Sequence, residues 1–334
     1  MGALRPDAIR TREEARDVKP AAFTYHRAHD VTDAVGLLTD LAAAGEDPKL
    51  IAGGQSLMPM MTFRLARPSA LVDLGPLRRV PSMTAIAESS DDGSSSPIGV
   101  LPSPSRLPGT LTLGALVTHH AVETAALSPG FAVLTDAMPW VGHLPIRSRG
   151  TVAGSLVHGD ATAEWCLLAL LLDAIVVAEG PAGRREIPAD ELFHGFYATA
   201  VDPDEVVVEV RFTRPAPHAA LSEFARRHGD FAIVDAAVAL EIEDHDVTGG
   251  RVVLGGVAPA PVRVPEAEAV LAGGGVAGGE AGRALFAAVA DAAAAAIDPP
   301  DDPPVTAAYR RRLTRTLVAD ACRRAVPQTA GDTR

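Results

Sequence analysis

Hydrophobic positions at the start of the chain follow helical and then strand spacing, which predicts a small α/β unit. A short strand is expected in "FTYHR", and the apolar residues at 35–41 then recur at helical spacing. Asp30 or Thr32 can cap the start of this helix, and Gly45 can end it. The apolar runs "KLIAGG" and "ALVDL" predict two buried strands, so the chain opens with a strand–helix–strand unit.

The middle of the chain continues this alternation of strands and helices. The segment "TLTLGALVT" alternates like a strand, and "HHAVETAALS" has the spacing of a helix. An apolar helix is predicted at about residues 162–172, and the strands "AIVVAEG" and "DEVVVEVRF" follow it. Residues 88–108 are rich in Ser and Pro, so we expect a mobile surface insertion without a packed element there.

The last third of the chain has the pattern of a separate α+β domain. After Pro215 and Pro217, two strands are predicted in "AAVALEIE" and "GGRVVLGGVA", and two long helices close the chain. The expected organisation is a polar extension at residues 1–18, a first domain at 19–215 and a smaller second domain at 216–327.

Charge and cysteine content exclude several classes of function. Acidic residues number 42 against 30 Lys and Arg, and the net charge of −12 leaves no basic excess for nucleic acid. Cys166 and Cys322 are the only cysteines, too few for a zinc knuckle or an iron–sulfur cluster. No apolar run reaches 18 residues, and the charged N-terminus lacks a signal-peptide core. We therefore expect a cytoplasmic protein without membrane insertion.

Two short segments rich in small residues have the chemistry of an anion-binding site. We call them the first glycine segment (residues 52–57, "AGGQSL") and the second glycine segment (residues 151–155, "TVAGS"). In each, small residues leave backbone N–H groups accessible, hydroxyl side chains add donors, and a helix follows. A plain structural turn explains the first one equally well. The pair is more specific, because two such turns about 100 residues apart can hold one diphosphate from both sides.

The residues after the second glycine segment are polar and admit more than one role. His158 and Asp160 can bind a metal, but two ligands are too few for a tight site, so no metal is assigned. Asp160 or Thr162 can cap the next helix, or these side chains can contact a ligand held by the second glycine segment. His119 and His120 stand at a strand–helix junction, where they are expected on the surface and receive no function.

Two other stretches invite a cofactor interpretation. Residues 273–278, "GGGVAG", match the dinucleotide pattern G-x-G-x-x-G, but the stretch before them has the pattern of a helix and not of a strand. They are therefore interpreted as a helix end and a flexible linker. Phe231, in "GDFAIV", stands at an expected strand start, where its ring can pack against a flat ligand or join the core.

Four motifs, in order along the chain, resemble the FAD-binding medium subunit of the molybdenum hydroxylases. That family includes the flavoprotein subunits of carbon monoxide dehydrogenase-like and of aldehyde or xanthine dehydrogenase-like enzymes. The motifs are "IAGGQSLMPMMTFRLARPSALVDL", "IRSRGTVAGSLVHGDATAE", "ELFHGFYATAVDPDEVVVEVRF" and "EFARRHGDFAIV". The likeness covers about residues 19–326.

The resemblance implies an α+β fold with FAD as the cofactor. A two-subdomain FAD-binding domain of the vanillyl-alcohol-oxidase (PCMH) type would precede a smaller α+β domain of the CO-dehydrogenase flavoprotein type. The resemblance also implies that the glycine segments bind the FAD diphosphate, that His158 and Glu164 lie along the cofactor, and that Phe231 lies near the isoalloxazine. The implied cofactor-binding residues are Ala52, Gly53, Gly54, Gln55, Ser56, Leu57, Thr151, Val152, Ala153, Gly154, Ser155, His158, Glu164 and Phe231.

Two residues in the second motif depart from the family pattern. Ala153 replaces the first glycine of the usual Thr-Ile-Gly-Gly, and Ser148 replaces an Asn that often precedes Arg-Gly-Thr. An alanine keeps the turn if its φ is negative, so FAD is still expected to bind. The insertion at residues 88–108 is also longer than usual.

The activity implied by the resemblance is electron output from a molybdenum-containing hydroxylase. Substrate would be oxidised at a molybdenum cofactor on a large subunit. Electrons would pass through two 2Fe–2S clusters on a small subunit to this FAD and then to an external acceptor, so no catalytic residue is named here. In the family a dimer of heterotrimers is usual. Two alternatives stay open: a free-standing FAD-dependent oxidase or reductase with His158 as its acid–base group, and a scaffold that no longer binds flavin.

Overall fold

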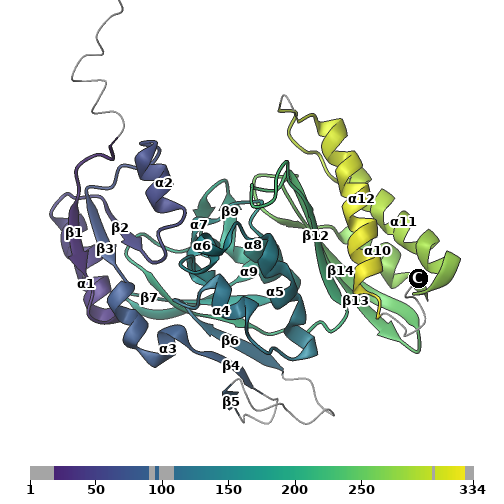
Figure 1. Cartoon of the computed structure of the whole chain (residues 1–334), viewed down its shortest axis with the longest axis horizontal. Coiled ribbons are helices and arrows are strands. Elements are labelled where there is room, and N and C mark those ends of the chain that lie inside the picture. The colour runs from purple at the N-terminus through teal and green to yellow at the C-terminus, as the bar shows by residue number, and fades with distance from the viewer. Residues whose placement is uncertain (1–18, 90–94, 98–108, 303–304, 328–334) are drawn as a thin grey trace, which may run out of the picture.

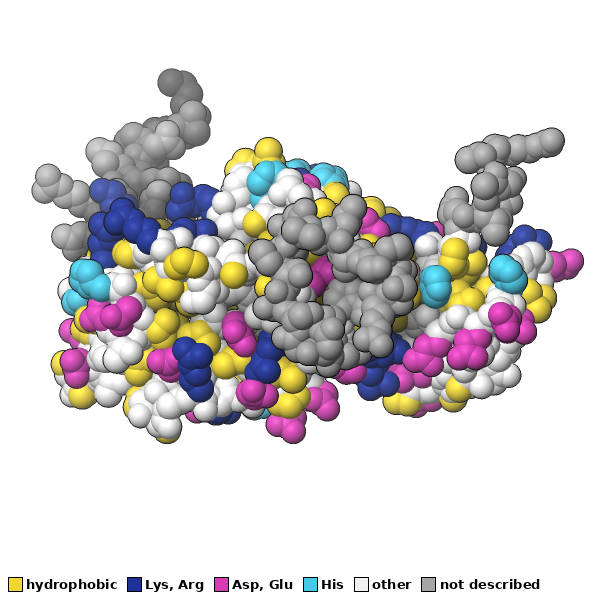
Figure 2. All heavy atoms as spheres, turned by 90° about the horizontal axis from the view of Figure 1, so that it is seen from below, with side chains coloured by type: hydrophobic (Ala, Val, Ile, Leu, Met, Phe, Trp, Pro, Cys, Tyr) yellow, Lys and Arg dark blue, Asp and Glu magenta, His cyan; other side chains and the backbone are white. Residues whose placement is uncertain are grey.

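Three regions lie side by side along the molecule, in chain order from one end to the other (Figure 1). The computed structural model describes residues 19–89, 95–97, 109–302 and 305–327, so the expected extension at residues 1–18 lies outside it. None of the helices in these ranges is long and apolar enough to cross a membrane. On the face shown in Figure 2, basic side chains are interspersed with acidic and apolar ones.

The first region is a three-stranded parallel sheet with the strand order β1-β3-β2. Its strands are β1 (Thr24–Arg27), β2 (Pro48–Ile51) and β3 (Ala70–Asp73), and its helices are α1 (Val31–Ala43) and α2 (Leu57–Thr62). The carboxylate of Asp30 accepts a hydrogen bond from the Asp33 N–H and so caps α1, and Gly45 follows the helix end with φ +85°. The predicted opening unit is confirmed.

The second region is built on a six-stranded antiparallel sheet with the order β5-β4-β6-β11-β7-β8. Short helices and one small hairpin cover it. The strands are β4 (Ile86–Ser89), β5 (Ser95–Pro97), β6 (Thr110–Gly114), β7 (Ala174–Gly180), β8 (Gly183–Pro188) and β11 (Val206–Phe212), with the hairpin β9 (Phe193–Gly195) and β10 (Ala198–Thr199). The α-helices are α3 (Pro81–Thr84), α4 (His119–Glu123), α5 (Ala132–Ala137), α6 (Leu144–Arg147), α7 (Val152–His158), α8 (Glu164–Leu171) and α9 (Ala189–Leu192).

The Ser/Pro-rich insertion at residues 88–108 was expected to contain no packed element. This expectation is wrong for residues 88–89, which end β4, and for residues 95–97. Residues 95–97 form β5, which pairs with β4 at the edge of the six-stranded sheet. Ladder hydrogen bonds come from the backbone, and an edge strand can include a proline. Residues 90–94 and 98–108 lie outside the described residues.

The third region is a four-strand antiparallel path, β12-β13-β14-β15, with three helices packed on it. Its strands are β12 (Ala219–Phe224), β13 (Val234–Glu243), β14 (Asp246–Gly255) and β15 (Val262–Arg263), and its helices are α10 (Pro265–Ala272), α11 (Gly279–Ala296) and α12 (Ala307–Ala325). Both predicted strands and both closing helices are confirmed. The stretch at 273–278 is not simply a flexible linker, because β16 (Gly275–Val276) pairs with β14.

The sheet of the third region is buried on both faces, which explains why β13 is apolar almost throughout. Ala237 and Ala239 belong to the core of the second region, whereas Ala236 and Val238 belong to a separate core with α11 and α12. Arg251 on β14 crosses the boundary and donates to the Leu170 carbonyl at 2.8 Å and to the Asp173 carboxylate at 2.5 Å. The three regions therefore pack as one body.

A group of carboxyls lies at the junction of the second and third regions. Asp235 on β13 is fully buried, and neither of its carboxyl oxygens has a hydrogen-bond partner among the described residues. Its cross-strand neighbour is Glu223 on β12. Desolvation raises the pKa of Asp235 well above its ordinary value, that of Glu223 to about 8, and that of Glu164 at the start of α8 to about 7. Burial therefore favours the protonated form of Asp235.

We expect Asp235→Ala to stabilise the protein at alkaline pH. The Asp235 carboxyl ionises near pH 4 in the unfolded chain but only at a much higher pH in the folded chain. Its contribution to the free energy of unfolding is thus fully present below about pH 4 and is lost as the pH rises toward the folded pKa. The substitution should raise the free energy of unfolding at about pH 8 by roughly 1–3 kcal/mol.

Urea unfolding measured from about pH 5 to about pH 9 checks this expectation. Asp246→Ala, at an exposed position on β14, is the control and should leave the pH dependence unchanged. An Asp235→Ala protein that is less stable than the unmodified chain at about pH 8 would contradict the expectation.

Candidate functional site

The first glycine segment lies directly against the two residues that precede the second one. A Cβ added to Gly53 would stand 2.2 Å from the Arg149 carbonyl oxygen and 2.8 Å from the Gly150 Cα. No side chain fits there, so the backbone at Gly53 meets the backbone at residues 149–150, directly before the second glycine segment. Gly54 has φ +72°, a conformation that side chains other than glycine's rarely adopt, and it turns the chain from β2 into α2.

Several backbone N–H groups of the two segments are not used in hydrogen bonds among the described residues. No described residue accepts a hydrogen bond from the backbone N–H groups of Gly53, Gly54, Gln55, Ser56, Leu57, Thr151 and Ala153. Adjacent free N–H groups form concave anion sites, because each can donate to a phosphate oxygen. The residues present therefore fit a diphosphate, the group by which FAD would be held here.

The second glycine segment is the start of a helix and not a turn before one. Thr151 is the N-cap of α7, and its hydroxyl accepts a hydrogen bond from the Gly154 N–H at 3.1 Å. Val152 and Ala153 are buried on the first turn of the helix. Ala153 is not among the residues with positive φ, so it meets the requirement that an alanine at this position have a negative φ. The helix predicted at about residues 162–172 is confirmed as α8 (Glu164–Leu171), whereas the short helix α7 before it was not predicted.

A cleft of about 1010 Å³ opens beside the first glycine segment, between the parallel sheet and α2. Tyr25, Met58 and Phe63 give the cleft apolar and aromatic lining. Residues 52–55 of the first glycine segment, Arg78 and Arg149 line it as well. Such a lining suits a ligand that has both a ring system and negative charge.

The two arginines supply the positive charge that a diphosphate needs. The guanidinium of Arg78 donates to the carbonyls of Leu116 and Arg149, both at 3.4 Å. Burial lowers the pKa of Arg78, with a smaller contribution from the nearby charge of Arg149. Guanidinium groups nevertheless remain charged in proteins, so the pair can neutralise phosphate oxygens.

Polar and aromatic side chains gather at the far end of α7. The rings of His158 and Tyr197 lie 4.9 Å apart, and the Tyr197 hydroxyl donates to Asp160 at 3.4 Å. Asp160 also accepts from the N–H and the hydroxyl of Thr162, both at 2.9 Å, in the turn before α8. The expectation that Asp160 or Thr162 caps that helix is wrong, because the N-cap of α8 is Ala163 and has no side-chain cap. Burial lowers the pKa of His158, while the charge of Asp160 opposes that shift. His158 is thus favoured in its neutral form at pH 7.

Glu164 and Phe231 lie outside the contact between the glycine segments. Glu164 begins α8, where it is close to the carboxyls of Glu223 and Asp235 at the junction of the second and third regions. Phe231 is 74 % exposed in the loop after β12, and β13 begins three residues later, at Val234. The strand start was therefore predicted too early. In the same loop, the His228 ring lies 5.7 Å from that of His143.

Three residues of the site escaped the sequence analysis, and one assignment was wrong. Arg149 stands directly before Gly150 in the second motif, so its position in that motif could have indicated a role at the site. No sequence pattern pointed to Arg78. Tyr197 has φ +53°, which no sequence pattern reveals. His119 was expected on the surface but is only 5 % exposed, because α4 packs its first turn against the second glycine segment.

The fold and the paired glycine segments define an FAD-binding flavoprotein, and comparisons with known proteins identify its family. Residues 21–215 match the family described as the FAD binding domain in molybdopterin dehydrogenase. Residues 219–325 match the CO dehydrogenase flavoprotein C-terminal domain. The chain therefore belongs to the FAD-binding medium subunits of the molybdenum hydroxylases, a family of oxidoreductases.

Individual relatives agree with this assignment. The chain is 38% identical to the 6-hydroxypseudooxynicotine dehydrogenase complex subunit alpha of Paenarthrobacter nicotinovorans, over 76% of this chain and 79% of that protein. It is 33% identical to the carbon monoxide dehydrogenase medium chain of Hydrogenophaga pseudoflava, over 73% and 78%. The solved structure of quinoline 2-oxidoreductase from Pseudomonas putida 86 matches with a TM-score of 0.78 at 30% identity, over 92% of this chain and 98% of that one.

We expect Gly53→Ala to weaken FAD binding by at least about tenfold. The new Cβ would force the Arg149 carbonyl to move by roughly 1 Å before it reached an ordinary contact distance. This displacement separates the two glycine segments and misaligns their free N–H groups. Quenching of FAD fluorescence on titration into the apoprotein measures the dissociation constant.

Gly36→Ala is the matched control for this substitution. Gly36 lies within α1, and a Cβ added there has no atom within 4 Å. The change should stabilise the chain by roughly 0.5–1 kcal/mol and leave FAD affinity unaltered. Equal FAD affinity of Gly53→Ala and the unmodified chain would show that the contact between the segments does not govern binding.

We expect Ala153→Gly, which restores the residue usual in the family, to bring no gain in FAD affinity. Ala153 already has helical geometry on α7, so glycine adds no conformation that the site needs. The dissociation constant should change by less than about threefold, while helix propensity lowers the free energy of unfolding by about 0.5–1 kcal/mol. A tenfold tighter complex would show instead that the alanine limits binding.

Proposed function

We propose that this chain is the electron-output subunit of a molybdenum-containing hydroxylase. It would receive electrons from an iron–sulfur subunit on its FAD and release them to an external acceptor. The observation that carries the proposal is the contact of Gly53 with residues 149–150, directly before the second glycine segment, together with the free backbone N–H groups in both segments. Gly53 and Arg149 both lie within residues 21–215, the part of the chain that matches the FAD-binding family, and residues 219–325 match its C-terminal domain. FAD binding is therefore the role that the geometry of this contact supports best.

The residues of this chain would bind and orient the cofactor. Backbone amides of residues 52–57 and 151–155 would hold the diphosphate, and Arg78 and Arg149 would neutralise its charge. His158 and Glu164 would lie along the cofactor, and Phe231 near the flavin ring. FAD itself supplies the redox chemistry, since it can take up and release electrons one at a time or in pairs.

The assignment of the metal centres to partner chains agrees with the cysteines of this one. Cys166 and Cys322 are both free and buried, and they lie in different cores, so they cannot ligate one cluster. We propose an iron–sulfur small subunit and a molybdenum-cofactor large subunit as partners, in a dimer of heterotrimers. The relatives named as medium chains or medium subunits, including that of nicotine 6-hydroxylase, support a multi-subunit enzyme.

The first test is a visible absorption spectrum of the purified chain, followed by denaturation and chromatography of the released flavin. We expect the absorption of oxidised flavin and release of FAD, with one FAD bound per chain. A colourless chain that cannot be reconstituted with FAD, alone or with its partner subunits, would overturn the proposal and favour the scaffold role.

The second test separates electron output from a free-standing oxidase. The complete complex, purified through a tag on this chain, should contain molybdenum and iron, and its flavin should be reduced when substrate is added. A flavin-loaded chain that oxidises an organic substrate by itself would favour the alternative, and loss of that activity in His158→Gln would then assign the acid–base group.

A further inference from the structure

The ring of His119 lies against Gly150, directly before the second glycine segment, and a hydrogen bond from Trp165 orients it. The indole N–H of Trp165 donates to Nδ1 of His119 at 2.9 Å, in fully protein-lined surroundings. An indole N–H can only donate, so Nδ1 must be the unprotonated nitrogen and Nε2 carries the hydrogen. Burial lowers the pKa of His119 to about 4, with a smaller contribution from Arg147. The neutral Nε2–H tautomer is therefore the form present at neutral pH.

The Nε2 side of the ring lies against Gly150. A Cβ added to Gly150 would stand 2.7 Å from Nε2 of His119, so the imidazole occupies the space that a side chain would need. The His119 N–H also donates to the Gly150 carbonyl at 3.1 Å, and the Val152 N–H donates to Val117 at 3.0 Å. Residues 117–119 and 150–152 thus form a short antiparallel bridge, and the imidazole packs against it at Gly150.

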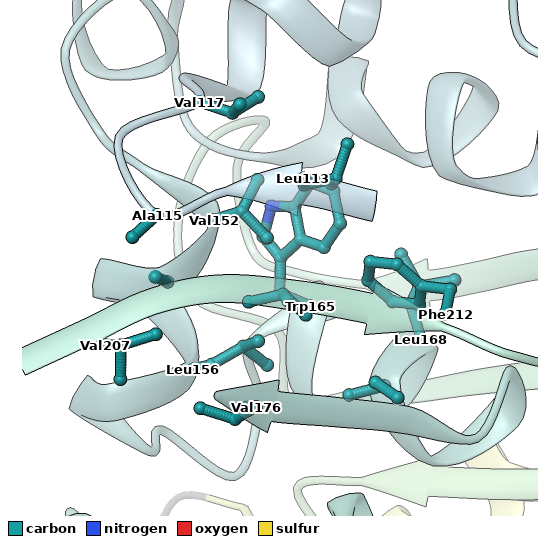
Figure 3. Packing of buried hydrophobic residues seen from close by; sticks show 14 of the residues in the cluster. Leu113, Ala115, Val117, Val152, Leu156, Trp165, Leu168, Val176, Val207 and Phe212 are labelled. Atoms are coloured by element: carbon teal, nitrogen blue, oxygen red, sulfur yellow. The ribbon is translucent and has the colours of Figure 1, made fainter. Parts of the chain in front are cut away.

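A continuous series of contacts connects the protein core, through His119, with the first glycine segment. Figure 3 shows the Trp165 indole in the core, near Val152 and Leu113, with Phe212 at the side of its ring. The Trp165 and Phe212 ring centres are 6.1 Å apart, and Trp165 is fully buried. Contacts therefore run from Trp165 to His119, from His119 to Gly150, and from the backbone at residues 149–150 to Gly53.

We propose that His119 is a positioning residue for the diphosphate of the cofactor. Oriented by Trp165, its imidazole holds the backbone at Gly150 in place and so sets the spacing between the two glycine segments. The inference rests on the proposed function, because it takes the two segments to be the place where FAD binds.

A simpler reading is that His119 only satisfies the buried indole N–H of Trp165. In that case any side chain that offers an acceptor in the place of Nδ1 would replace it fully, and FAD affinity would follow stability. The positioning role requires in addition a group in the place of Nε2, against Gly150. The two ends of the ring can therefore be tested separately.

The experiment uses three substitutions that separate these ends. His119→Ala removes the ring, and with it both the acceptor for Trp165 and the packing against Gly150. His119→Asn offers an amide oxygen near the place of Nδ1, and His119→Gln offers an N–H near the place of Nε2. For each full-length protein, the free energy of unfolding of the apo form and the FAD dissociation constant are measured. Phe286→Leu, within the core formed with α11 and α12, controls for a general loss of stability.

We expect His119→Ala to weaken FAD binding by about 10- to 100-fold. His119→Asn should recover stability but remain as weak in FAD binding as His119→Ala, because its side chain does not reach the place of Nε2. His119→Gln should recover at least about threefold in affinity over His119→Ala, even where it is less stable than His119→Asn. Phe286→Leu should lose stability with its FAD affinity unchanged. Should His119→Ala not fold, the comparison of the Asn and Gln variants decides.

The inference is overturned if FAD affinity follows stability through the series, or if all three variants bind FAD as the unmodified chain does. If the unmodified chain binds FAD, either result leaves the proposed function intact and removes only the role of His119. An unmodified chain that binds no FAD fails the proposed function itself, so the two failures are distinguishable.

Discussion

The close approach of two backbones at Gly53 is the constraint on which the site depends. A single added carbon would meet the Arg149 carbonyl at 2.2 Å, so the first and second regions can join only where the chain has no side chain. The contact at Gly53 also determines where the free backbone N–H groups of the glycine segments lie relative to a bound ligand. Anion recognition by backbone amides requires this precision, because each N–H contributes only if its direction and distance match a phosphate oxygen.

The core of the protein supports this contact from behind. Trp165, His119 and Gly150 connect the centre of the second region to the join, and each step is a direct contact or a hydrogen bond. The third region adds a sheet buried on both faces, in which desolvation raises the pKa of Asp235. A rigid support of this kind suits electron transfer, in which the protein must hold a cofactor still and has no proton to abstract from a substrate.

The division of labour within the family agrees with the chemistry of this chain. Two buried cysteines in separate cores cannot hold a cluster, and the free amides and arginines near Gly53 suit a phosphate-bearing cofactor. Substrate choice would then lie with a partner. Relatives with the same medium-subunit fold accordingly belong to enzymes named for carbon monoxide, quinoline and nicotine.

The sequence by itself determined the elements and the family. Apolar periodicity located β2, α1, β13 and α12, because local spacing decides which face of an element is buried. The four motifs predicted the fold and the two glycine segments. Only the tertiary structure decided that Gly53 touches Arg149, that His119 is buried beneath Gly150, and that Arg78 faces the same cleft. Those relations join residues about 30 to 100 positions apart, and no local pattern encodes contacts across that distance.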